Sequence, residues 1–332
     1  MDGLAALSSR LRVLDGVRLW ANAPLAPFTT IGTGGKAGLL VTVQTAESLV
    51  AVLAAVEDAE ANWFCLGAGS NLLVSDRGYR GVVIKLDEPF HYVEGLPAAP
   101  PDPDAECRPA VLTVGAAAYL ARLAAVVAEA GLSGMEHACG IPGSIGGAVA
   151  MNAGAYGWCL RDVLEEIQIV SADGMRWVPA GDLEWGYRFC RLPERSVVTA
   201  ARIRLTPADC QTVLECQRGY LRQRREKQPR SVRTFGSTFK NPPGQHAGRL
   251  VEASGLKGVR CGGAEISTVH GNFLVNLGDA TTADVLVLMV LMRQGVERVS
   301  GITLEPEVRL LGASFPWDAS ADRPLRQPAA DG

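Results

Sequence analysis

The sequence predicts a mixed α and β fold in about two domains. Three observations support this prediction. The chain has 332 residues, about twice the typical length of one domain. Apolar segments of strand length alternate with amphipathic segments of helix length, and segments rich in glycine or proline separate them. Hydrophobic residues make up 48% of the chain and charged residues 20%, a balance typical of globular proteins.

Charge and composition exclude several classes of protein. The chain has 32 basic and 35 acidic residues, and this balance excludes a nucleic-acid binder that works through a broad basic surface. It has no run of about 18 consecutive apolar residues, so a membrane span is not expected. Ser, Arg and Asp interrupt the apolar residues of segment 1–16, which therefore lacks the apolar core of a secretory signal. We expect a cytoplasmic protein.

Cysteine and histidine give no metal signature. No CxxC pair and no HExxH motif occurs, so we expect no metal site. In a cytoplasmic chain the cysteines are expected to be free thiols, mostly small residues that fill the core. The eight cysteines are Cys65, Cys107, Cys139, Cys159, Cys190, Cys210, Cys216 and Cys261.

The first predicted unit spans about residues 20–90. Segment 39–44 is expected to be a strand, and Thr45 is expected to cap a helix. That helix has apolar residues at the spacing i, i+3, i+4, i+7, namely Leu49, Val52, Leu53 and Val56. Further strands are expected at 63–67, 72–76 and 81–86. Segment 95–110, with its five prolines, is expected to be a loop.

The second and third units cover about residues 111–206 and 207–312. The second is expected to contain a strand at 111–115, a helix at 117–130, a Gly-rich segment at 140–157, a hairpin at 163–180 around the turn 172–174, and a strand at 196–205. The third is expected to contain a basic helix at 218–227, a helix at 247–255, a strand at 272–278, a helix at 282–298 and a strand at 304–312. The tail from Ala313 is expected to be disordered.

Two Gly-rich segments could hold an anionic ligand through backbone amides. Segment 66–72 follows a predicted strand, but Leu72 and the strand-like residues after it do not fit a dinucleotide-binding Rossmann motif. Segment 140–157 contains six glycines, and ordering so much glycine needs a compensating interaction. Tight turns are the alternative interpretation of each segment. Together they favour a bound dinucleotide.

Three other segments carry polar candidates. Arg188, in Gly-Tyr-Arg, could clamp a carboxylate or be an ordinary surface residue. Ser237, in Gly-Ser-Thr-Phe-Lys-Asn-Pro, could donate a proton or be a structural turn residue. In Leu-Glu-Pro-Glu-Val-Arg, period two places Glu305, Glu307 and Arg309 on one face of the expected strand, either solvated or buried with a partner.

A basic stretch adds a fourth candidate. Segment 218–233 carries seven positive residues. Its basic side chains either form a solvated helix face or face the phosphates of a sugar nucleotide.

Taken together, these segments resemble the UDP-N-acetylenolpyruvoylglucosamine reductase family. The resemblance covers about residues 20–312, and its motifs occur in the family's order. They are TTIGTGGKA, LGAGSNLLVSD, GLSGMEHACGIPGSIGGAVAMNAGAYG, GYRFC, GSTFKNP, AGRLVEASGLKG, GGAEIS, NFLVN and LEPEVR. The short path after Arg188 resembles the family's compact variant.

The resemblance implies an α+β protein with a vanillyl-alcohol-oxidase/PCMH-type FAD-binding fold in two subdomains and a C-terminal α/β substrate-binding domain. The implied ranges are 20–92 and 110–206 for the two FAD-binding subdomains, 207–312 for the C-terminal domain and 313–332 for a disordered tail. The implied FAD-binding residues are Gly67, Ala68, Gly69, Ser70, Asn71, Leu72, Gly140, Ile141, Pro142, Gly143, Ser144, Gly146, Gly147, Asn152 and Gly154.

The resemblance also implies the reaction. A hydride passes from NADPH through FAD to the methylene carbon of UDP-N-acetylglucosamine enolpyruvate, in peptidoglycan precursor synthesis. Arg188 would stabilise the developing negative charge, Ser237 would deliver the proton, and Glu307 would orient the carboxylate end. Tyr187 and Asn241 would contact the substrate. A monomer is expected.

Three departures from the family pattern stand in this chain. Cys190 replaces a usual serine, Gly32 lies where a basic residue is usual, and the proline-rich segment 95–110 is unusual. Other functions remain open at this point: an oxidase of the same fold acting on another substrate, a non-catalytic sugar-nucleotide sensor, or a cell-wall scaffold protein.

Overall fold

The computed structural model describes residues 2–98 and 108–318, and they form two compact units. Unit 1 contains residues 2–20, 40–68, 82–98 and 108–224. Unit 2 contains residues 21–39, 69–81 and, as far as the structure describes them, 225–318. These units do not coincide with the predicted domain ranges, because segments 21–39 and 69–81 belong with the C-terminal part of the chain.

The first sheet has the strand order β1-β2-β5-β3. Its strands are β1 (Val17–Ala21), β2 (Ala37–Val43), β3 (Trp63–Cys65) and β5 (Tyr79–Leu86). Two helices precede or join these strands, namely α1 (Asp2–Arg12) and α2 (Ala46–Asp58). The predicted cap of α2 is confirmed: the Thr45 hydroxyl accepts a hydrogen bond from Ser48 N at 3.1 Å.

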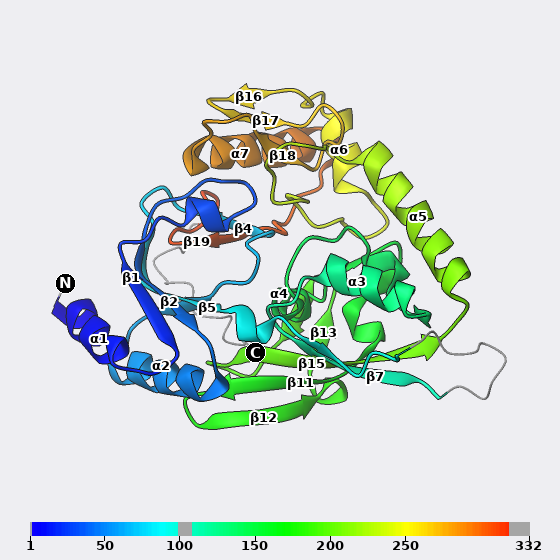
Figure 1. Cartoon of the computed structure of the whole chain (residues 1–332). Helices are drawn as coiled ribbons and strands as arrows, with labels where there is room; N and C mark the ends of the chain where they lie inside the picture. The colour runs from blue at the N-terminus through cyan, green and yellow to red at the C-terminus, as the bar shows by residue number, and fades with distance from the viewer. Residues whose placement is uncertain (1, 99–107, 319–332) are drawn as a thin grey trace. The chain divides into compact units, whose positions relative to one another are not determined.

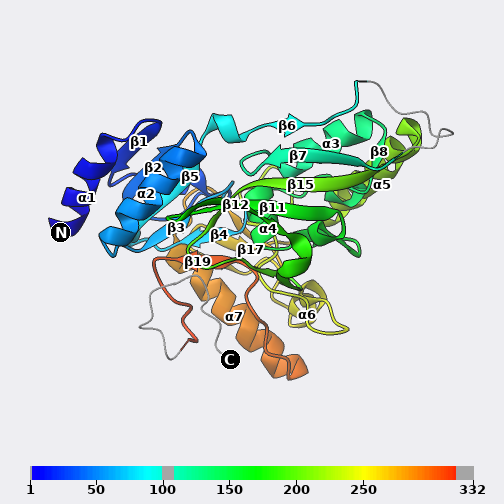
Figure 2. The same cartoon turned by 90° about the horizontal axis from the view of Figure 1, so that it is seen from below.

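The second sheet of unit 1 has the order β12-β11-β15-β7-β6, with β8 also paired to β15. Figure 2 shows β7, β15, β11 and β12 side by side. The strands are β6 (Val93–Glu94), β7 (Ala110–Gly115), β8 (Leu132–Ser133), β11 (Leu164–Ser171), β12 (Gly174–Pro179) and β15 (Val197–Pro207). The associated helices are α3 (Leu120–Glu129), α4 (Ile145–Ala150), which packs on β15, and α5 (Cys210–Lys227).

Short elements complete the description of the elements outside the C-terminal part. Two small hairpins are formed by β9 (Gly154–Ala155) with β10 (Trp158–Cys159), and by β13 (Glu184–Gly186) with β14 (Phe189–Arg191). The 3-10 helices are η1 (Ala26–Phe28), η2 (Glu88–Phe90), η3 (Glu136–Ala138), η4 (Leu160–Asp162) and η5 (Ala180–Asp182).

Unit 2 combines a parallel strand pair with a small antiparallel sheet. The parallel pair joins β4 (Leu72–Val74) to β19 (Arg309–Leu311), with Leu73 opposite Leu310. The antiparallel sheet has the order β16 (Arg260–Cys261), β17 (Ala264–Ile266) and β18 (Leu274–Asn276). Two helices complete the unit, α6 (Ala247–Ala253) and α7 (Thr282–Ser300), and α7 lies against β16 and β17 (Figure 1).

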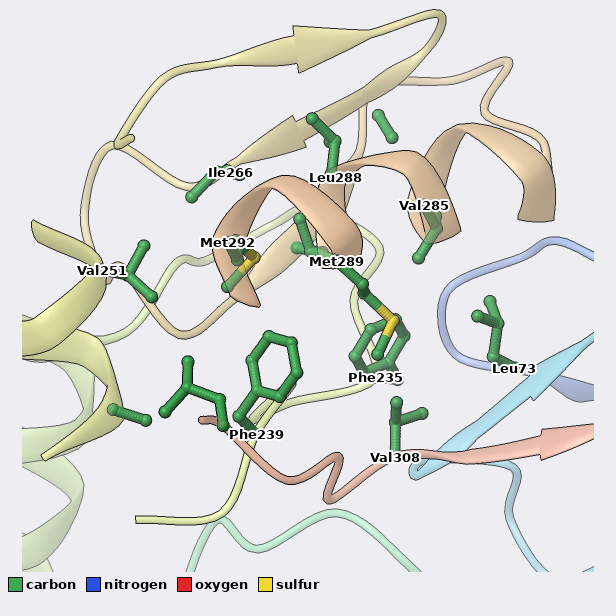
Figure 3. Packing of buried hydrophobic residues seen from close by; sticks show 14 of the residues in the cluster. Leu73, Phe235, Phe239, Val251, Ile266, Val285, Leu288, Met289, Met292 and Val308 are labelled. Carbon is green, nitrogen blue, oxygen red and sulfur yellow. The ribbon is translucent and has the colours of Figure 1, made fainter. Parts of the chain in front are cut away.

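One apolar cluster forms the core of unit 2. Phe235 and Phe239 lie at its centre and are 2% and 0% exposed (Figure 3). Residues from α7, β17, β4 and the C-terminal segment surround these rings, among them Leu73, Ile266, Val285, Leu288, Met289, Met292 and Val308. Two phenylalanines four residues apart therefore anchor the segment that contains Ser237.

Several sequence predictions are confirmed. The strands at 39–44, 81–86, 111–115 and 196–205 all occur within a residue or a few of the predicted limits. The hairpin around 172–174 is present as β11 and β12, with Ser171 opposite Gly174. These elements depend on local periodicity and turn residues, which a sequence displays directly.

The predicted strand at 304–312 is wrong over its first half, because only Arg309–Leu311 is regular strand. Pro306 forms a single bridge with Phe239, and the Arg293 side chain donates to the Leu304 carbonyl oxygen at 3.3 Å. The backbone of 304–308 therefore bonds to several different segments. The expected exposure pattern persists in part, since Leu304 and Val308 are buried.

Two further predictions need correction. The expected disordered tail does not begin at Ala313, because Phe315 and Trp317 pack against the core of unit 2 and stack on each other at 5.1 Å. Residues 319–332 lie outside the described part. Among the seven described cysteines only Cys139 and Cys190 are buried, so the cysteines are not mostly core residues.

Candidate active site

Ser237 lies in a segment that the core of unit 2 holds on both sides. Ser237 is half-buried, whereas its neighbour Thr238 is fully buried. Gly236, with φ of 84°, turns the chain just before it, and Gly236 N donates to the Thr234 hydroxyl at 3.2 Å. Ser237 then forms an antiparallel bridge with Phe273. The hydroxyl is thus carried by a segment with little freedom to shift.

Glu307 lies beside this segment. Glu307 N donates to the Thr238 carbonyl oxygen at 2.9 Å, and Lys240 N donates to the Glu305 carbonyl oxygen at 2.9 Å. The Asn71 side chain donates from Nδ2 to the Glu307 carbonyl oxygen at 3.0 Å. The structure therefore brings together three residues that the sequence predicts to be functional, Ser237, Glu307 and Asn71, from three separate segments of unit 2.

Arg188 lies in unit 1, at the tip of the β13–β14 hairpin. Gly186 pairs with Phe189, so Tyr187 and Arg188 form a two-residue turn. Arg188 has φ of 60°, a conformation that non-glycine residues adopt at an energetic cost. Its guanidinium carbon lies 5.0 Å from the centre of the Tyr187 ring. A predicted catalytic residue, Arg188, and a predicted substrate contact, Tyr187, therefore share one turn.

Asn152 links the Gly-rich segment to this hairpin. It is 6% exposed, and its Nδ2 donates to the Gly186 carbonyl oxygen at 3.1 Å. Its Oδ1 accepts from Arg161 N at 3.3 Å. Both polar atoms of the Asn152 side chain, which is a predicted FAD-binding group, therefore have partners within unit 1. One partner is Gly186, which lies two positions before Arg188.

The two Gly-rich segments meet within unit 1 at Gly67 and Ser144. A Cβ at Gly67 would lie 2.5 Å from the Ser144 hydroxyl oxygen, which is closer than any real contact of that kind. Ser144 is also the N-cap of α4, where its hydroxyl accepts from Gly147 N at 3.4 Å. A side chain at position 67 would displace that hydroxyl, so glycine keeps the backbone of 66–68 close to the start of α4, as a cradle for a dinucleotide requires. The residues present therefore fit FAD.

The remaining predicted FAD-binding residues divide between the units. Those in unit 1 are Ala68, Gly140, Ile141, Pro142, Gly143, Gly146, Gly147 and Gly154. Those in unit 2 are Gly69, Ser70, Asn71 and Leu72. Leu72 is 4% exposed within β4, so its side chain belongs to the core and only its backbone is available to a ligand.

Of the predicted substrate contacts, Asn241 lies in unit 2. Asn241 is exposed, and its Oδ1 accepts from Ala247 N, at the start of α6, at 3.0 Å. Tyr187 has 51% of its surface exposed. A ligand can reach both side chains.

Arg224 is a residue that the sequence prediction did not single out from its basic stretch. A Cβ at Gly140 would lie 3.2 Å from Arg224 Cδ and Nε, so the arginine crosses the Gly-rich segment. Burial lowers the pKa of the Arg224 guanidinium, and the charge of Arg188 lowers it further. Gln217, Leu221 and Arg224 recur at helical spacing on the inner face of α5. That spacing is the signal that could have separated Arg224 from its solvated neighbours.

The described residues 2–98 and 108–318 hold neither a metal centre nor a membrane-spanning helix. No group of three or more His, Cys, Asp and Glu side chains there could hold a metal ion. No helix in the same ranges is both long enough and apolar enough to cross a membrane.

Two family models match separate parts of the chain. An FAD binding domain model matches residues 37–178. The model of the C-terminal domain of UDP-N-acetylenolpyruvoylglucosamine reductase matches residues 228–311. The class of protein is therefore a flavoprotein with an FAD-binding domain and a C-terminal reductase domain, and the predicted α+β flavin fold is confirmed.

Relatives extend the match to nearly the whole chain. A UDP-N-acetylenolpyruvoylglucosamine reductase of Anaeromyxobacter dehalogenans is 46% identical over 311 residues, which cover 94% of this chain and 90% of that protein. A protein of the same name from Myxococcus xanthus is 40% identical, over 92% and 96% of the two chains. The crystal structure of the Thermus caldophilus reductase has a TM-score of 0.74 and 37% identity, and covers 89% of this chain and 98% of that one. The chain belongs to the UDP-N-acetylenolpyruvoylglucosamine reductase family.

Proposed function

We propose that the chain is an FAD-dependent reductase that converts UDP-N-acetylglucosamine enolpyruvate to UDP-N-acetylmuramate with NADPH, in peptidoglycan precursor synthesis. The family membership supports the reaction. One observation supports the assignment of this reaction to particular residues. Glu307 N donates to the Thr238 carbonyl oxygen at 2.9 Å and so pairs the Ser237 segment with the Glu307 segment.

FAD, when bound, supplies a hydride that comes from NADPH. The residues that would hold it are the two Gly-rich segments 67–72 and 140–147, together with Asn152 and Gly154. The approach of Gly67 to Ser144 supports this assignment, since it leaves backbone amides rather than side chains to face the cofactor. Asn152 contributes by fixing the backbone of these segments to the hairpin that carries Arg188.

Ser237 donates the proton that completes the reduction. Hydride addition to the methylene carbon leaves negative charge shared between the adjacent carbon and the carboxylate. A serine hydroxyl is a very weak acid, so it delivers a proton only to a strongly basic carbon, and this carbon is one. The position of Ser237, half-buried between anchored residues, supports the role because proton transfer needs a fixed donor.

Arg188 and Glu307 act on the carboxylate end of the substrate. The Arg188 guanidinium offers two parallel N–H donors, which match a carboxylate and stabilise the charge that develops on it. Glu307 orients that end of the substrate as a protonated carboxyl, which donates a hydrogen bond to the substrate carboxylate. Tyr187 and Asn241 contact other parts of the substrate. The protein acts as a monomer in the cytoplasm.

One departure from the family pattern has a counterpart in the structure. Gly32 has φ of 75°, and a Cβ there would lie 2.9 Å from Arg233 Nη1. A basic side chain, that of Arg233, therefore already occupies the space beside position 32. We propose that Arg233 supplies there the positive charge that the family usually carries near position 32.

An anaerobic visible spectrum tests the proposed function. The purified protein is expected to carry a yellow flavin that bleaches with NADPH and recovers its colour when the enolpyruvyl nucleotide is added. A flavin that bleaches and recovers only with oxygen would instead indicate an oxidase of the same fold. A protein that takes up no FAD on reconstitution would contradict the enzyme assignment and favour a sugar-nucleotide sensor.

A further inference from the structure

Asn272 is a buried side chain that the proposed mechanism does not use. It is 3% exposed and lies in unit 2, between His270 and Phe273. Its Oδ1 accepts from Phe239 N at 3.0 Å, and its Nδ2 donates to the Phe239 carbonyl oxygen at 2.7 Å. Its own carbonyl oxygen accepts from Thr238 N at 2.8 Å. Three hydrogen bonds thus run from one asparagine to the two residues after Ser237.

A carboxamide is the side chain that suits this position. Phe239 offers one N–H donor and one C=O acceptor in a fully buried place, and both need partners. An amide presents a donor and an acceptor side by side, as a neighbouring strand does. A carboxylate would satisfy the N–H and repel the carbonyl oxygen, and an alanine would leave both groups unpaired.

The loop that carries Asn272 is itself ordered by internal hydrogen bonds. The Ser267 hydroxyl accepts from Val269 N at 3.1 Å and from His270 N at 3.3 Å. Asn272 N donates to His270 Nδ1 at 3.1 Å. Because these bonds fix the backbone at 272, the asparagine reaches the Ser237 segment from a defined position.

The Ser237 segment therefore has a fixed neighbour on each side. Thr238 N donates to Asn272, and the Thr238 carbonyl oxygen accepts from Glu307 N at 2.9 Å. We propose that Asn272 is a positioning residue, which sets Ser237 in register with Glu307 for proton delivery. This inference rests on the proposed function. It assigns no contact between Asn272 and the substrate.

The variant Asn272→Asp tests the proposal, since it keeps the shape of the side chain and removes the donor. We expect reduction of the flavin by NADPH to change by less than about twofold. Reoxidation by the enolpyruvyl nucleotide is expected to slow by about 10² or more, because a displacement of about 1 Å is enough for such a loss. Equal slowing of both half-reactions would overturn the proposal.

A double variant distinguishes positioning from general damage. If Asn272 acts through Ser237, Asn272→Asp adds little to the loss in reoxidation already caused by Ser237→Ala. If the fold-losses in reoxidation rate of the two single variants multiply in the double variant, the two residues act independently and the proposal is contradicted. If Asn272→Asp does not fold, Asn272→Ser, which keeps one hydrogen-bonding group, takes its place in the same cycle.

Asn276→Asp is the matched control. Asn276 is 5% exposed, lies in the same unit, and its Nδ2 donates to the Ile31 carbonyl oxygen at 2.9 Å. Loss of this hydrogen bond is expected to lower the free energy of unfolding and to leave the ratio of the two half-reaction rates unchanged. A shift of that ratio as large as in Asn272→Asp would overturn the proposal. A wild-type flavin that NADPH bleaches and the nucleotide never reoxidises would overturn the proposed function, and this inference with it.

Discussion

The Asn71 side chain donates a hydrogen bond to the Glu307 carbonyl oxygen at 3.0 Å across 236 residues of sequence. Directly beyond these residues, β4 and β19 pair in parallel. A predicted FAD-binding residue therefore fixes the backbone of a predicted catalytic residue within one unit.

Ser237→Ala is expected to separate the two half-reactions. Reduction of bound flavin by NADPH should remain nearly intact, because the hydroxyl plays no part in it. Reoxidation by the enolpyruvyl nucleotide should slow by about 10² to 10⁴, as removal of an acid–base group typically does. Anaerobic stopped-flow absorbance measures both rates. Equal losses in the two rates would refute the role of Ser237 as proton donor.

Gly67→Ala is expected to weaken FAD binding. The new methyl group would lie 2.5 Å from the Ser144 hydroxyl oxygen, so the cap of α4 must move. Overpacking of this kind costs about 1–3 kcal/mol, which corresponds to a rise in Kd of about fivefold to 150-fold. The flavin content after purification and a titration of the apoprotein measure it.

Gly181→Ala is the control for that substitution. Gly181 lies in η5 of the same unit, and a Cβ there would meet nothing within 4 Å. Its FAD affinity should equal that of the wild type. Equal affinities of the Gly67→Ala and wild-type proteins would show that the Gly67 contact does not shape the cofactor site.

Asp284 is expected to give α7 a stability that depends on pH. Its Oδ2 accepts from Thr281 N at 2.9 Å, and the Thr281 hydroxyl accepts from Asp284 N at 3.1 Å, a reciprocal cap. These hydrogen bonds hold the pKa of the carboxyl below its usual value of 3.8. The stabilisation is therefore complete above about pH 4 and is lost as the pH falls through the lowered pKa.

Asp284→Asn imitates the protonated residue and tests this pH dependence. We expect the variant to be less stable than the wild type by about 1 kcal/mol at pH 7, and the difference to vanish only in acid below the lowered pKa of Asp284. Urea unfolding followed by circular dichroism measures it. Asp173→Asn, in the β11–β12 turn, controls for the loss of one negative charge. A difference that does not change with pH would contradict the assignment.

Cys190 is expected to resist thiol reagents in the folded protein. It is 5% exposed, and burial raises the pKa of its thiol to about 12, so almost no thiolate forms near neutral pH. Cys216, on α5, is exposed. Iodoacetamide at pH 8 should therefore modify Cys216 first and Cys190 only after denaturation, as peptide mass spectrometry can show. Labelling of both at one rate would contradict the burial of Cys190.

Local patterns were enough to predict part of the fold. The cap at Thr45 and the hairpin around 172–174 depend on residues close together in sequence, and both are confirmed. The irregular backbone at 304–308 depends instead on Phe239, Arg293 and the segment around Lys240. Period two alone could not reveal those long-range partners.

Part of the candidate site could likewise be predicted from the sequence, and part could not. Ser237 and Glu307 carry motifs that a resemblance can transfer, and the structure places their segments together. Asn272 carries no chemistry of its own, so only its hydrogen bonds to Phe239 reveal it. The prediction of a disordered tail wrongly included Trp317. Its ring lies against Phe239 and Arg293, and the sequence alone does not show these contacts.

The parallel pair of β4 and β19 also affects synthesis on the ribosome. The three residues of β4 are buried, yet Leu310, the partner of Leu73, emerges more than two hundred residues later. At about 5–20 residues per second, β4 stays unpaired for on the order of tens of seconds. During this interval the nascent chain exposes an apolar strand, which favours aggregation between neighbouring chains and offers a binding site for a chaperone. Any chain that stops before Leu310 keeps that exposed strand.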